Sequence, residues 1–385
     1  MARSCRVTVK EIASEIMEQA YLKASSNGQY PAHARQIMYA ARPQILAKAD
    51  CDRLDDAYFT QQLLPDYIQE HPGLTAKWDV VFDARGHLYE PHTNREIALG
   101  TIDVRAYLNK IRSHVVDEIA ADVGVGGLFP TMGPQNRYGA ILFIEKEGFL
   151  PLFRKIRLFE RYDMAPMSTK GMSTAASRLL VDTLCWQDVP LLVVHDFDKA
   201  GFSILSTLQQ DTRRYRFSHN VNVIDLGLRL EDVQEWNLQS EQCTFGKSNP
   251  RGNLRENGAT EEEIEFLCAG YGSRGYHGKR VELNAFASDE LVHWIEGKLQ
   301  QQAIKKVIPD RETLETAYRR ARLTNVLNEQ LASLVEAAKN EVDALKLDSG
   351  RIAREVKKRL QQHREMSWDQ AITEIIEAKQ SGEAA

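Results

Sequence analysis

Two stretches of sequence decide the fold: AILFIE at residues 140–145 and LLVVHDFDKAG at residues 191–201. Each is a short apolar run that stops at carboxylates, and the second then passes into a helical pattern. Short apolar runs of this kind predict buried strands of a parallel sheet. Open α/β sheets place their sites at the carboxyl ends of the strands, so we expect Glu145, Asp196 and Asp198 to share one edge.

The residues around these stretches predict alternating strands and helices. The predicted strands cover 139–145, 164–168, 190–195 and 221–226, and the predicted helices cover about 150–158, 174–184 and 200–209. This order indicates a parallel sheet with helices on both faces. Residues 126–136, rich in Gly and Pro, are interpreted as a linker that precedes this domain.

The carboxylates at the strand ends predict a metal site. Asp196 and Asp198 are two residues apart in an extended segment, so both side chains project to the same side. With Glu145 they form an oxygen-rich set that suits Mg²⁺. We interpret His195 as a packed or supporting residue, and Gly201 as the residue that permits a sharp turn into the next helix. The alternative is that the carboxylates only cap helices, but E…D-x-D-x-x-G in an α/β frame is more specific than a lone D-x-D.

The first 130 residues predict a smaller module. We predict helices that begin at Thr8, at Pro31 and near Ala57, and then a hairpin whose strands, 78–82 and 87–89, flank Asp83–Gly86. Three short helices and a hairpin describe a winged helix-turn-helix, a module that lays a helix in the DNA major groove. A small α+β domain without a DNA role fits the same pattern, and the sequence leaves both interpretations open.

Arg35 and Tyr39 lie four residues apart on the second predicted helix and therefore share a face. A guanidinium beside a phenol suits a phosphodiester, because the Arg neutralises the phosphate while the tyrosyl oxygen attacks phosphorus. For a Tyr taken alone, an ordinary packed aromatic is the plainer explanation.

Length and composition indicate a globular protein of two or three domains, with 385 residues, 43% hydrophobic and 27% charged. No apolar run reaches the length of a membrane span, and residues 1–5 lead into a helix, so we expect a cytoplasmic protein, associated with the nucleoid if it is prokaryotic. The five cysteines lack zinc-ligand spacing and predict reduced thiols. The net charge of −5 requires that any DNA-binding surface be a local patch.

Residues 301–385 predict a helical extension whose long first pattern breaks near Ser349. Its basic groups lie among acids, which favours a solvated face over a phosphate-binding one, although a dimer clamp or partner-docking role stays open. Arg154 beside the first acidic strand and Arg213 after the helix that follows the second are better placed to contact DNA.

The acidic frame resembles a Toprim domain, the metal-binding fold of topoisomerases, bacterial primases and some nucleases. Several segments are similar to the A subunit of topoisomerase VI and its meiotic double-strand-break relatives. They are ILFIEKE at 141–147, STKG at 168–171 with Arg178 downstream (family T-x-K-G-[YF]-P-D…R), DFDKAGFSI at 196–204 (family D-x-D-P-x-G-x-x-I), Arg35-x-x-Met38-Tyr39 (family R-x-x-[YF]-Y), and 226–233 and 279–285 for later Toprim motifs.

This resemblance covers about residues 30–300 and keeps the family's order of domains. The sequence departs from the family at several positions: Lys199 stands where Pro is usual, Met172 and Met38 where aromatics are usual, and Ser173-Thr174 where Pro-Asp is usual. These departures indicate a divergent branch, similar to the compact stand-alone "Mini-A" proteins of mobile elements.

The resemblance implies a winged helix at 1–130, a Toprim domain at 131–300 and a helical region at 301–385. It implies an enzyme of the type IIB DNA topoisomerase kind, a homodimer that cleaves double-stranded DNA by tyrosyl transesterification with Mg²⁺. In that mechanism Tyr39 is the nucleophile, Arg35 steadies the phosphate, and Glu145, Asp196 and Asp198 hold the metal, with Glu145 also an acid/base. Lys170 and Arg178 join Arg154 and Arg213 as candidate DNA contacts.

Gly246-Lys247-Ser248 does not form a phosphate-binding loop, because such a loop needs Gly at position 241, which is Glu. Any ATPase that drives the reaction is therefore expected on a separate chain. Two other functions stay open. One is a Toprim nuclease in plasmid or phage defence, in which water replaces Tyr39, and the other is a DNA-binding regulator with a degenerate Toprim domain.

Overall fold

The computed structural model describes residues 8–82, 86–90, 95–112, 137–169, 175–185, 189–211, 215–304 and 306–380. The predicted linker at 126–136 lies outside these ranges. Contacts divide the chain into two units. The first comprises residues 1–86, 98–109 and 131–310, and the second comprises 87–97, 110–130 and 311–385. The predicted division into three domains stays a prediction.

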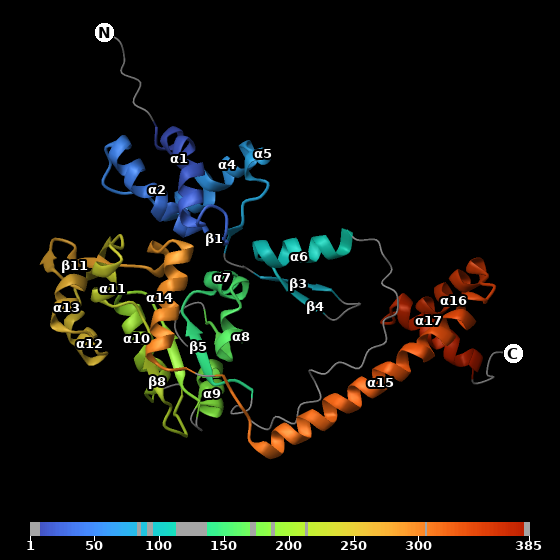
Figure 1. Ribbon diagram of the computed structural model, residues 1–385. Coiled ribbons are helices and arrows are strands. Elements are labelled where there is room, and N and C mark those ends of the chain that lie inside the picture. Colours follow the sequence, from blue (N-terminus) through green and yellow to red (C-terminus); the bar gives the residue numbers. More distant parts are fainter. Residues whose placement is uncertain are drawn as a thin grey trace, which may run out of the picture. The chain divides into compact units, whose positions relative to one another are not determined.

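A four-stranded parallel sheet forms the centre of the first unit (Figure 1). Its order is β6-β5-β7-β8, with β5 at Ala140–Ile144, β6 at Met164–Met167, β7 at Leu191–Val194 and β8 at Val223–Asp225. Every residue of the central strands β5 and β7 is buried, as expected for strands covered on both faces. The predicted α/β fold with a parallel sheet is confirmed.

Alternate residues of the central strands enter two different apolar clusters. Leu142 and Leu192 pack in one cluster, whereas Ile141 and Leu191 pack in the other. The helices between the strands are α7 (Leu150–Lys155), α8 (Leu158–Tyr162), α9 (Ala175–Leu184) and α10 (Lys199–Gln209). The single helix predicted at 150–158 is wrong: Arg157 adopts a left-handed φ of 54° and separates α7 from α8.

A second, three-stranded sheet follows the parallel one in the first unit. Its antiparallel order is β10-β11-β9, with β9 at Glu241–Gly246, β10 at Gly270–Gly272 and β11 at Gly275–Arg280. The helices around it are α11 (Leu230–Glu235), α12 (Arg251–Glu256), α13 (Glu261–Leu267) and α14 (Ser288–Gln301), with a 3₁₀ turn at Leu283–Ala285. A bridge between Phe197 and Val281 joins this sheet to the end of β7, so the chain after β11 passes the acidic edge.

The N-terminal part of the first unit is mainly helical. It comprises α1 (Val9–Ala24), β1 (Ala32–His33), α2 (Ala34–Ala49), α3 (Asp56–Tyr58), a π-helical turn at Phe59–Leu63, α4 (Leu64–Glu70), α5 (Pro72–Thr75) and β2 (Val80–Val81). The predicted cap of α1 is present, since Thr8 and Glu11 form a capping box. Tyr21 stacks on Trp78 with ring centroids 4.1 Å apart in the core of this part.

The predicted hairpin between 78–82 and 87–89 is wrong. Strand β2 pairs in parallel with β1, and β3 (His87–Glu90) pairs with β4 (Arg95–Ala98) instead. The reason is burial: β1 and β2 are buried, whereas β3 is mostly exposed, so β2 and β3 share no apolar face. A winged helix in this region therefore stays a prediction.

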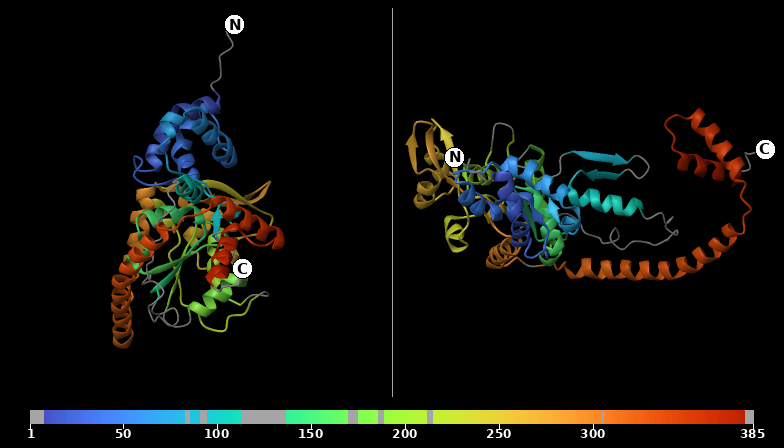
Figure 2. Two further views of the ribbon diagram at one scale, coloured as in Figure 1. Left: turned by 90° about the vertical axis from the view of Figure 1, so that its right-hand side faces the viewer. Right: turned by 90° about the horizontal axis from the view of Figure 1, so that it is seen from above.

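The second unit contains the C-terminal helices. They are α15 (Arg311–Asp343), one continuous helix of 33 residues (Figure 2), α16 (Ser349–Gln362) and α17 (Trp368–Gln380). Ser349 opens α16, with Asp348 as its N-cap, so the break in the pattern precedes Ser349. Among the described helices, including α6 (Thr101–Arg112), none is long and apolar enough to span a membrane.

Candidate active site

The two central strands bring Glu145 and Asp196 to the same edge of the sheet. Ile144, the last residue of β5, is in register with Val194, the last residue of β7, so the two strands end side by side. The backbone N–H of Asp196 donates to the Glu145 carboxylate, with 3.3 Å between N and Oε2. The topology therefore places the first two predicted metal ligands side by side.

Crowding of carboxylates disturbs the protonation of this edge. Burial, together with the charges of Asp196 and Asp198, raises the pKa of Glu145 from 4.5 to about 7. Burial also raises the pKa of Asp196, against the opposing effect of the Lys146 ammonium. The raised pKa values of Glu145 and Asp196 thus come first from burial of the two carboxyl groups and second from their neighbouring carboxylates.

Lys146 bridges two acids. Its Nζ lies 2.6 Å from Asp196 Oδ2 and 2.9 Å from Glu282 Oε2, while Asp196 Oδ1 accepts a bond of 2.8 Å from the backbone N–H of Leu283. These contacts connect the end of β7 to the segment after β11. The ammonium stands where a bound cation would offset Asp196, and Asp196 and Glu282 raise its own pKa despite burial.

Asp198 has a different environment from Asp196. Its carboxylate accepts a bond of 2.7 Å from the backbone N–H of Gly201 and caps α10, while Phe197 between the two acids is fully buried. The helix-capping alternative therefore holds for Asp198 and not for Asp196. A carboxylate has lone pairs for both a cap and a cation, so this bond is compatible with either role.

The donor chemistry of the edge fits a divalent cation. Carboxylate oxygens are the ligands that Mg²⁺ prefers, and the edge brings the carboxylate of Glu145 next to the backbone of Asp196. Within the described residues, no group of three or more His, Cys, Asp or Glu side chains is gathered closely enough to hold a metal. In this arrangement Asp196 is paired with the Lys146 ammonium instead.

His195 is fully buried and contacts the backbone that carries Asp196. Its Nδ1 lies 2.7 Å from the carbonyl oxygen of Asp196, and its Nε2 lies 3.1 Å from Asp225 Oδ1. Both partners are acceptors, so the geometry favours a doubly protonated ring. A Cβ on Gly201 would lie 2.2 Å from the carbonyl oxygen of Asp196 and 2.5 Å from the Nδ1 of His195, and one on Gly227 would lie 2.1 Å from the Nε2 of His195. Close approach to the Asp196 backbone and to His195 therefore requires glycine at 201.

Tyr39 lies on α2 and is only 1% exposed. Among the described residues, its hydroxyl has no hydrogen-bond partner. Burial and the nearby carboxylates of Glu282 and Glu241 raise the pKa of the Tyr39 phenol far above its ordinary value. The predicted nucleophile is therefore covered and uncharged in this structure.

The backbone of Tyr39 is also held by a residue from outside its helix. Pro43 has no N–H, so the Tyr39 carbonyl oxygen lacks the donor that an α-helix ordinarily supplies. The side-chain amide of Gln239 donates to it instead, at 2.8 Å. This bond joins α2 to the segment that leads into β9.

Arg35 links the tyrosine helix to the acidic edge. Its Nη1 lies 2.9 and 2.8 Å from the two oxygens of Glu282, which is 2% exposed and also receives Lys146 and Arg280. Burial alone would raise the pKa of Glu282, but Lys146 and Arg35 lower it to about 2. The predicted residues Arg35 and Asp196 thus belong to one chain of charges that runs through Glu282 and Lys146.

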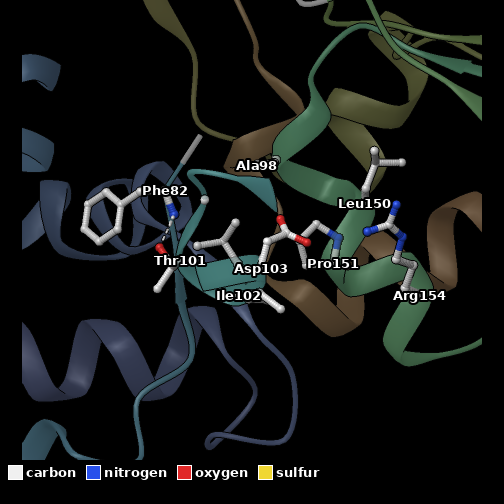
Figure 3. A pocket seen from close by; sticks show the side chains of 11 residues that line it. Phe82, Ala98, Thr101, Ile102, Asp103, Leu150, Pro151 and Arg154 are labelled. Atoms are coloured by element: carbon white, nitrogen blue, oxygen red, sulfur yellow. Dashed lines mark hydrogen bonds between the residues drawn. The ribbon is translucent and has the colours of Figure 1, made fainter. Parts of the chain in front are cut away.

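The four candidate DNA contacts have different positions. Lys170 and Arg213 lie outside the described residues. Arg178 on α9 is 7% exposed and therefore offers little of its side chain to a ligand. Arg154 on α7 is exposed and lines a pocket of about 130 Å³ together with Asp103 of α6 (Figure 3). An acid in the same small pocket opposes phosphate binding there.

A parallel sheet with acids at its carboxyl edge agrees with the predicted Toprim domain, and the comparison with known families identifies it. Residues 140–303 match the family model for the Toprim domain that the A subunit of topoisomerase 6 shares with Spo11. The prediction is confirmed for this domain: the chain carries a Toprim domain of the topoisomerase VI and Spo11 kind over residues 140–303. This domain supports a DNA-cleaving function of the type IIB kind. None of the curated proteins compared with the chain matches it.

The sequence analysis assigns no role to several residues of this region, although the sequence contains features that could have pointed to some of them. Lys146 directly follows the first acid, and Glu282 lies in a segment that resembles a Toprim motif. Pro43 inside a helix signals a free carbonyl at Tyr39. No local pattern predicts the partners Glu241 and Gln239, because they meet α2 only through the tertiary fold.

Proposed function

We propose that this protein cleaves both strands of DNA by Mg²⁺-dependent tyrosyl transesterification, as an A-subunit-like enzyme of the type IIB topoisomerase kind. One observation carries the proposal: the helix that bears Arg35 and Tyr39 is joined to the acidic edge of a Toprim domain through Glu282 and Lys146. Each chain thus carries a candidate phosphate-binding residue, a candidate nucleophile and a candidate cation-binding set, which the proposed dimer combines between its two copies.

In the proposed reaction the Tyr39 oxygen attacks a backbone phosphorus and displaces the 3′ oxygen of the neighbouring nucleotide. A 5′-phosphotyrosyl bond forms as the phosphodiester breaks, so the energy of the bond is kept and resealing needs no ATP in the chemical step. Arg35 neutralises the phosphate. Glu145 exchanges the proton that the phenol loses and the 3′ oxygen gains.

Glu145, Asp196 and Asp198 are the residues that would hold Mg²⁺, which supplies charge stabilisation at the phosphate and the leaving oxygen when bound. Each copy of the chain carries one Tyr39 and one such set, so cutting two strands requires two copies. We propose a C₂ homodimer on double-stranded DNA, in which the family resemblance implies that Tyr39 of one protomer meets the acids of its partner. A separate ATPase subunit belongs to the same proposal.

The test is incubation of supercoiled plasmid with the protein and Mg²⁺, with the Tyr39→Phe variant beside it. The wild-type protein should give linear DNA with protein bound covalently to the 5′ ends, and chelation of Mg²⁺ should abolish cutting. Tyr39→Phe should remove both the cleavage and the covalent adduct. Asp196→Ala should remove cleavage whether the nucleophile is Tyr39 or a water molecule. Cutting by Tyr39→Phe without any adduct would exclude the transesterase.

The burial of Tyr39 favours a second candidate, a Toprim nuclease of plasmid or phage defence that uses water as the nucleophile. A side chain that is 1% exposed is an ordinary core residue in most proteins. This candidate requires Glu145 and Asp196 but not Tyr39, so the same plasmid experiment separates the two. A DNA-binding regulator would give no Mg²⁺-dependent cleavage with any variant.

A further inference from the structure

Two guanidinium groups flank Tyr39 on α2, and each is engaged by a carboxylate of the Toprim domain of the same chain. Arg35 pairs with Glu282, and Arg42 Nη1 lies 3.1 Å from Glu241 Oε1. The Arg42 guanidinium carbon also lies 5.7 Å from the centre of the Tyr39 ring. We call Arg35, Tyr39 and Arg42 the α2 face, and Glu241 and Glu282 the acidic rim.

The acidic rim covers the α2 face closely. Side-chain exposure is 35% for Arg35 and 15% for Arg42, against 3% for Glu282 and 12% for Glu241. Arg280 adds positive charge to the rim, since its Nη2 lies 3.0 Å from Glu241 Oε2 and 3.2 Å from Glu282 Oε1. Two arginines beside a tyrosine are thus paired with two carboxylates. The phosphates of a DNA backbone are anions that arginine binds in the same way.

We propose that the α2 face is a surface for two DNA phosphates, with Arg42 as a phosphate contact not foreseen from the sequence, and that the acidic rim masks it by standing in the place of those phosphates. The proposal rests on the proposed function, because it explains how Tyr39 becomes available to DNA. DNA and the rim then compete for the same two arginines, and Tyr39 is uncovered only when the rim is displaced.

The burial of Tyr39 requires such an exchange. Tyr39 packs in the apolar cluster of the N-terminal part with Glu241 and Glu282 near its phenol, so its hydroxyl cannot reach a phosphorus atom of duplex DNA in this arrangement. The contacts that must break are two ion pairs and hydrogen bonds such as Gln36 Nε2 to the Phe286 carbonyl, at 3.0 Å. Phosphates that replace the carboxylates restore the ion pairs and release counterions, which favours the exchange.

The test uses the two partners of one ion pair, Glu241→Gln and Arg42→Gln, and two measurements that need no cleavage. The first is nitration of Tyr39 by tetranitromethane, located by peptide mass spectrometry. We expect both variants to raise the nitration rate of Tyr39 about tenfold. Loss of a close ion pair shifts the equilibrium from the state with the rim on α2 towards the state with the rim displaced by about that factor. The double variant should add little to either single change.

The second measurement is the affinity for a short DNA duplex without Mg²⁺, followed by fluorescence anisotropy. Glu241→Gln should tighten binding, because Arg42 and Arg280 are released for phosphates, whereas Arg42→Gln should weaken it. Opposite effects that clearly exceed those of the charge-matched variants Glu15→Gln and Lys48→Gln are the signature of competition, because any change of net charge alters DNA affinity to some extent. A merely structural pair would give effects no larger than those of the matched variants, or effects in the same direction.

A matched pair on the same helix provides the control. Lys48 of α2 pairs with Glu15 of α1 at 3.1 Å, and Glu15→Gln and Lys48→Gln change the net charge as the test variants do. Both controls should leave Tyr39 nitration at the wild-type rate. Tyr21, 2% exposed, is the internal buried reference, and Tyr318, 74% exposed, is the reactive one.

Three outcomes overturn the proposal: Tyr39 stays unreactive in both test variants, Tyr21 becomes reactive together with Tyr39, or DNA affinity changes in the same direction in both variants. The second outcome means general unfolding rather than release of the rim. Failure of the tyrosyl chemistry itself appears only in the plasmid assay, so the two proposals fail separately.

Discussion

At the scale of single residues, His195 illustrates how the acidic edge is supported. The ring fills the space between two glycines and contacts the backbone of Asp196 on one side and Asp225 on the other. The sequence allowed His195 to be interpreted as a packed residue, because it lies at the end of an apolar run. Its partner Asp225 comes from a different strand, and only the parallel pairing of β7 with β8 brings the two together.

Gly227→Ala should destabilise the protein by about 1–3 kcal/mol, because the added methyl group would lie 2.1 Å from His195 Nε2 in a packed core. Gly252→Ala on α12 is the matched control: nothing lies within 4 Å of its Cβ, and alanine favours a helix. Urea unfolding measures both. Equal stability of the two variants would show that the backbone around His195 adjusts freely.

The pair of buried His195 and partly exposed Asp225 predicts a pH dependence of stability. Burial opposes ionisation of Asp225, but hydrogen bonds from His195 and Gly227 lower its pKa from 3.8 to about 2. A lowered carboxyl pKa stabilises the fold above pH 3.8 and loses this effect as the pH falls towards 2. Burial disfavours the charged form of His195, but the hydrogen bond and the charge of Asp225 raise its pKa above 6.5. Protonated His195 therefore stabilises the fold fully below pH 6.5, and this stabilisation is lost as the pH rises through the raised pKa.

The measurement is the free energy of unfolding against pH for the wild type and Asp225→Asn. The wild type should lose about 2 kcal/mol more than the variant as the pH falls from about 4 to 2, since one pKa unit corresponds to about 1.4 kcal/mol. Parallel curves for the two proteins would mean that Asp225 is not the titrating group.

At the scale of elements, the sequence predicts best where burial is continuous along the chain. Strands β5 and β7 are apolar throughout, so their position and their acidic ends follow from the pattern alone. The hairpin prediction failed because the choice of partner for β2 depends on a buried strand, β1, far away in sequence. The break between α7 and α8 depends on the left-handed φ of one arginine, Arg157, which no periodicity reveals.

We predict an energetic coupling between Pro43 and Gln239, because both determine how the carbonyl oxygen of Tyr39 on α2 is hydrogen-bonded. Gln239→Ala leaves the Tyr39 carbonyl without a donor, which should cost about 1–3 kcal/mol for a buried acceptor. Pro43→Ala supplies a helical N–H to the same carbonyl, so Gln239→Ala should cost clearly less in that background. Unfolding free energies of the two single variants and the double variant complete the cycle. Strict additivity would contradict this account of the tyrosine helix.

At the scale of the whole molecule, the proposed chemistry needs one Tyr39 for each DNA strand and therefore two chains. Mixing wild-type protein with an excess of Tyr39→Phe before adding plasmid tests this requirement. Mixed dimers retain one nucleophile, so the main product should shift from linear DNA to DNA nicked in one strand. A simple fall in the amount of linear DNA, without nicked product, would indicate that each chain cuts independently.

The ammonium of Lys146 has a consequence for how the protein is made and stored. The acidic edge carries its own internal counterion, bound to Asp196 and Glu282, so these acids are partly neutralised as soon as the chain folds. In the proposed reaction, uptake of a divalent ion at Asp196 would be an ion exchange, in which the metal replaces the ammonium of Lys146. We therefore predict that the chain folds without a metal, and that a chelator would inhibit the proposed cleavage reversibly and would not unfold the protein.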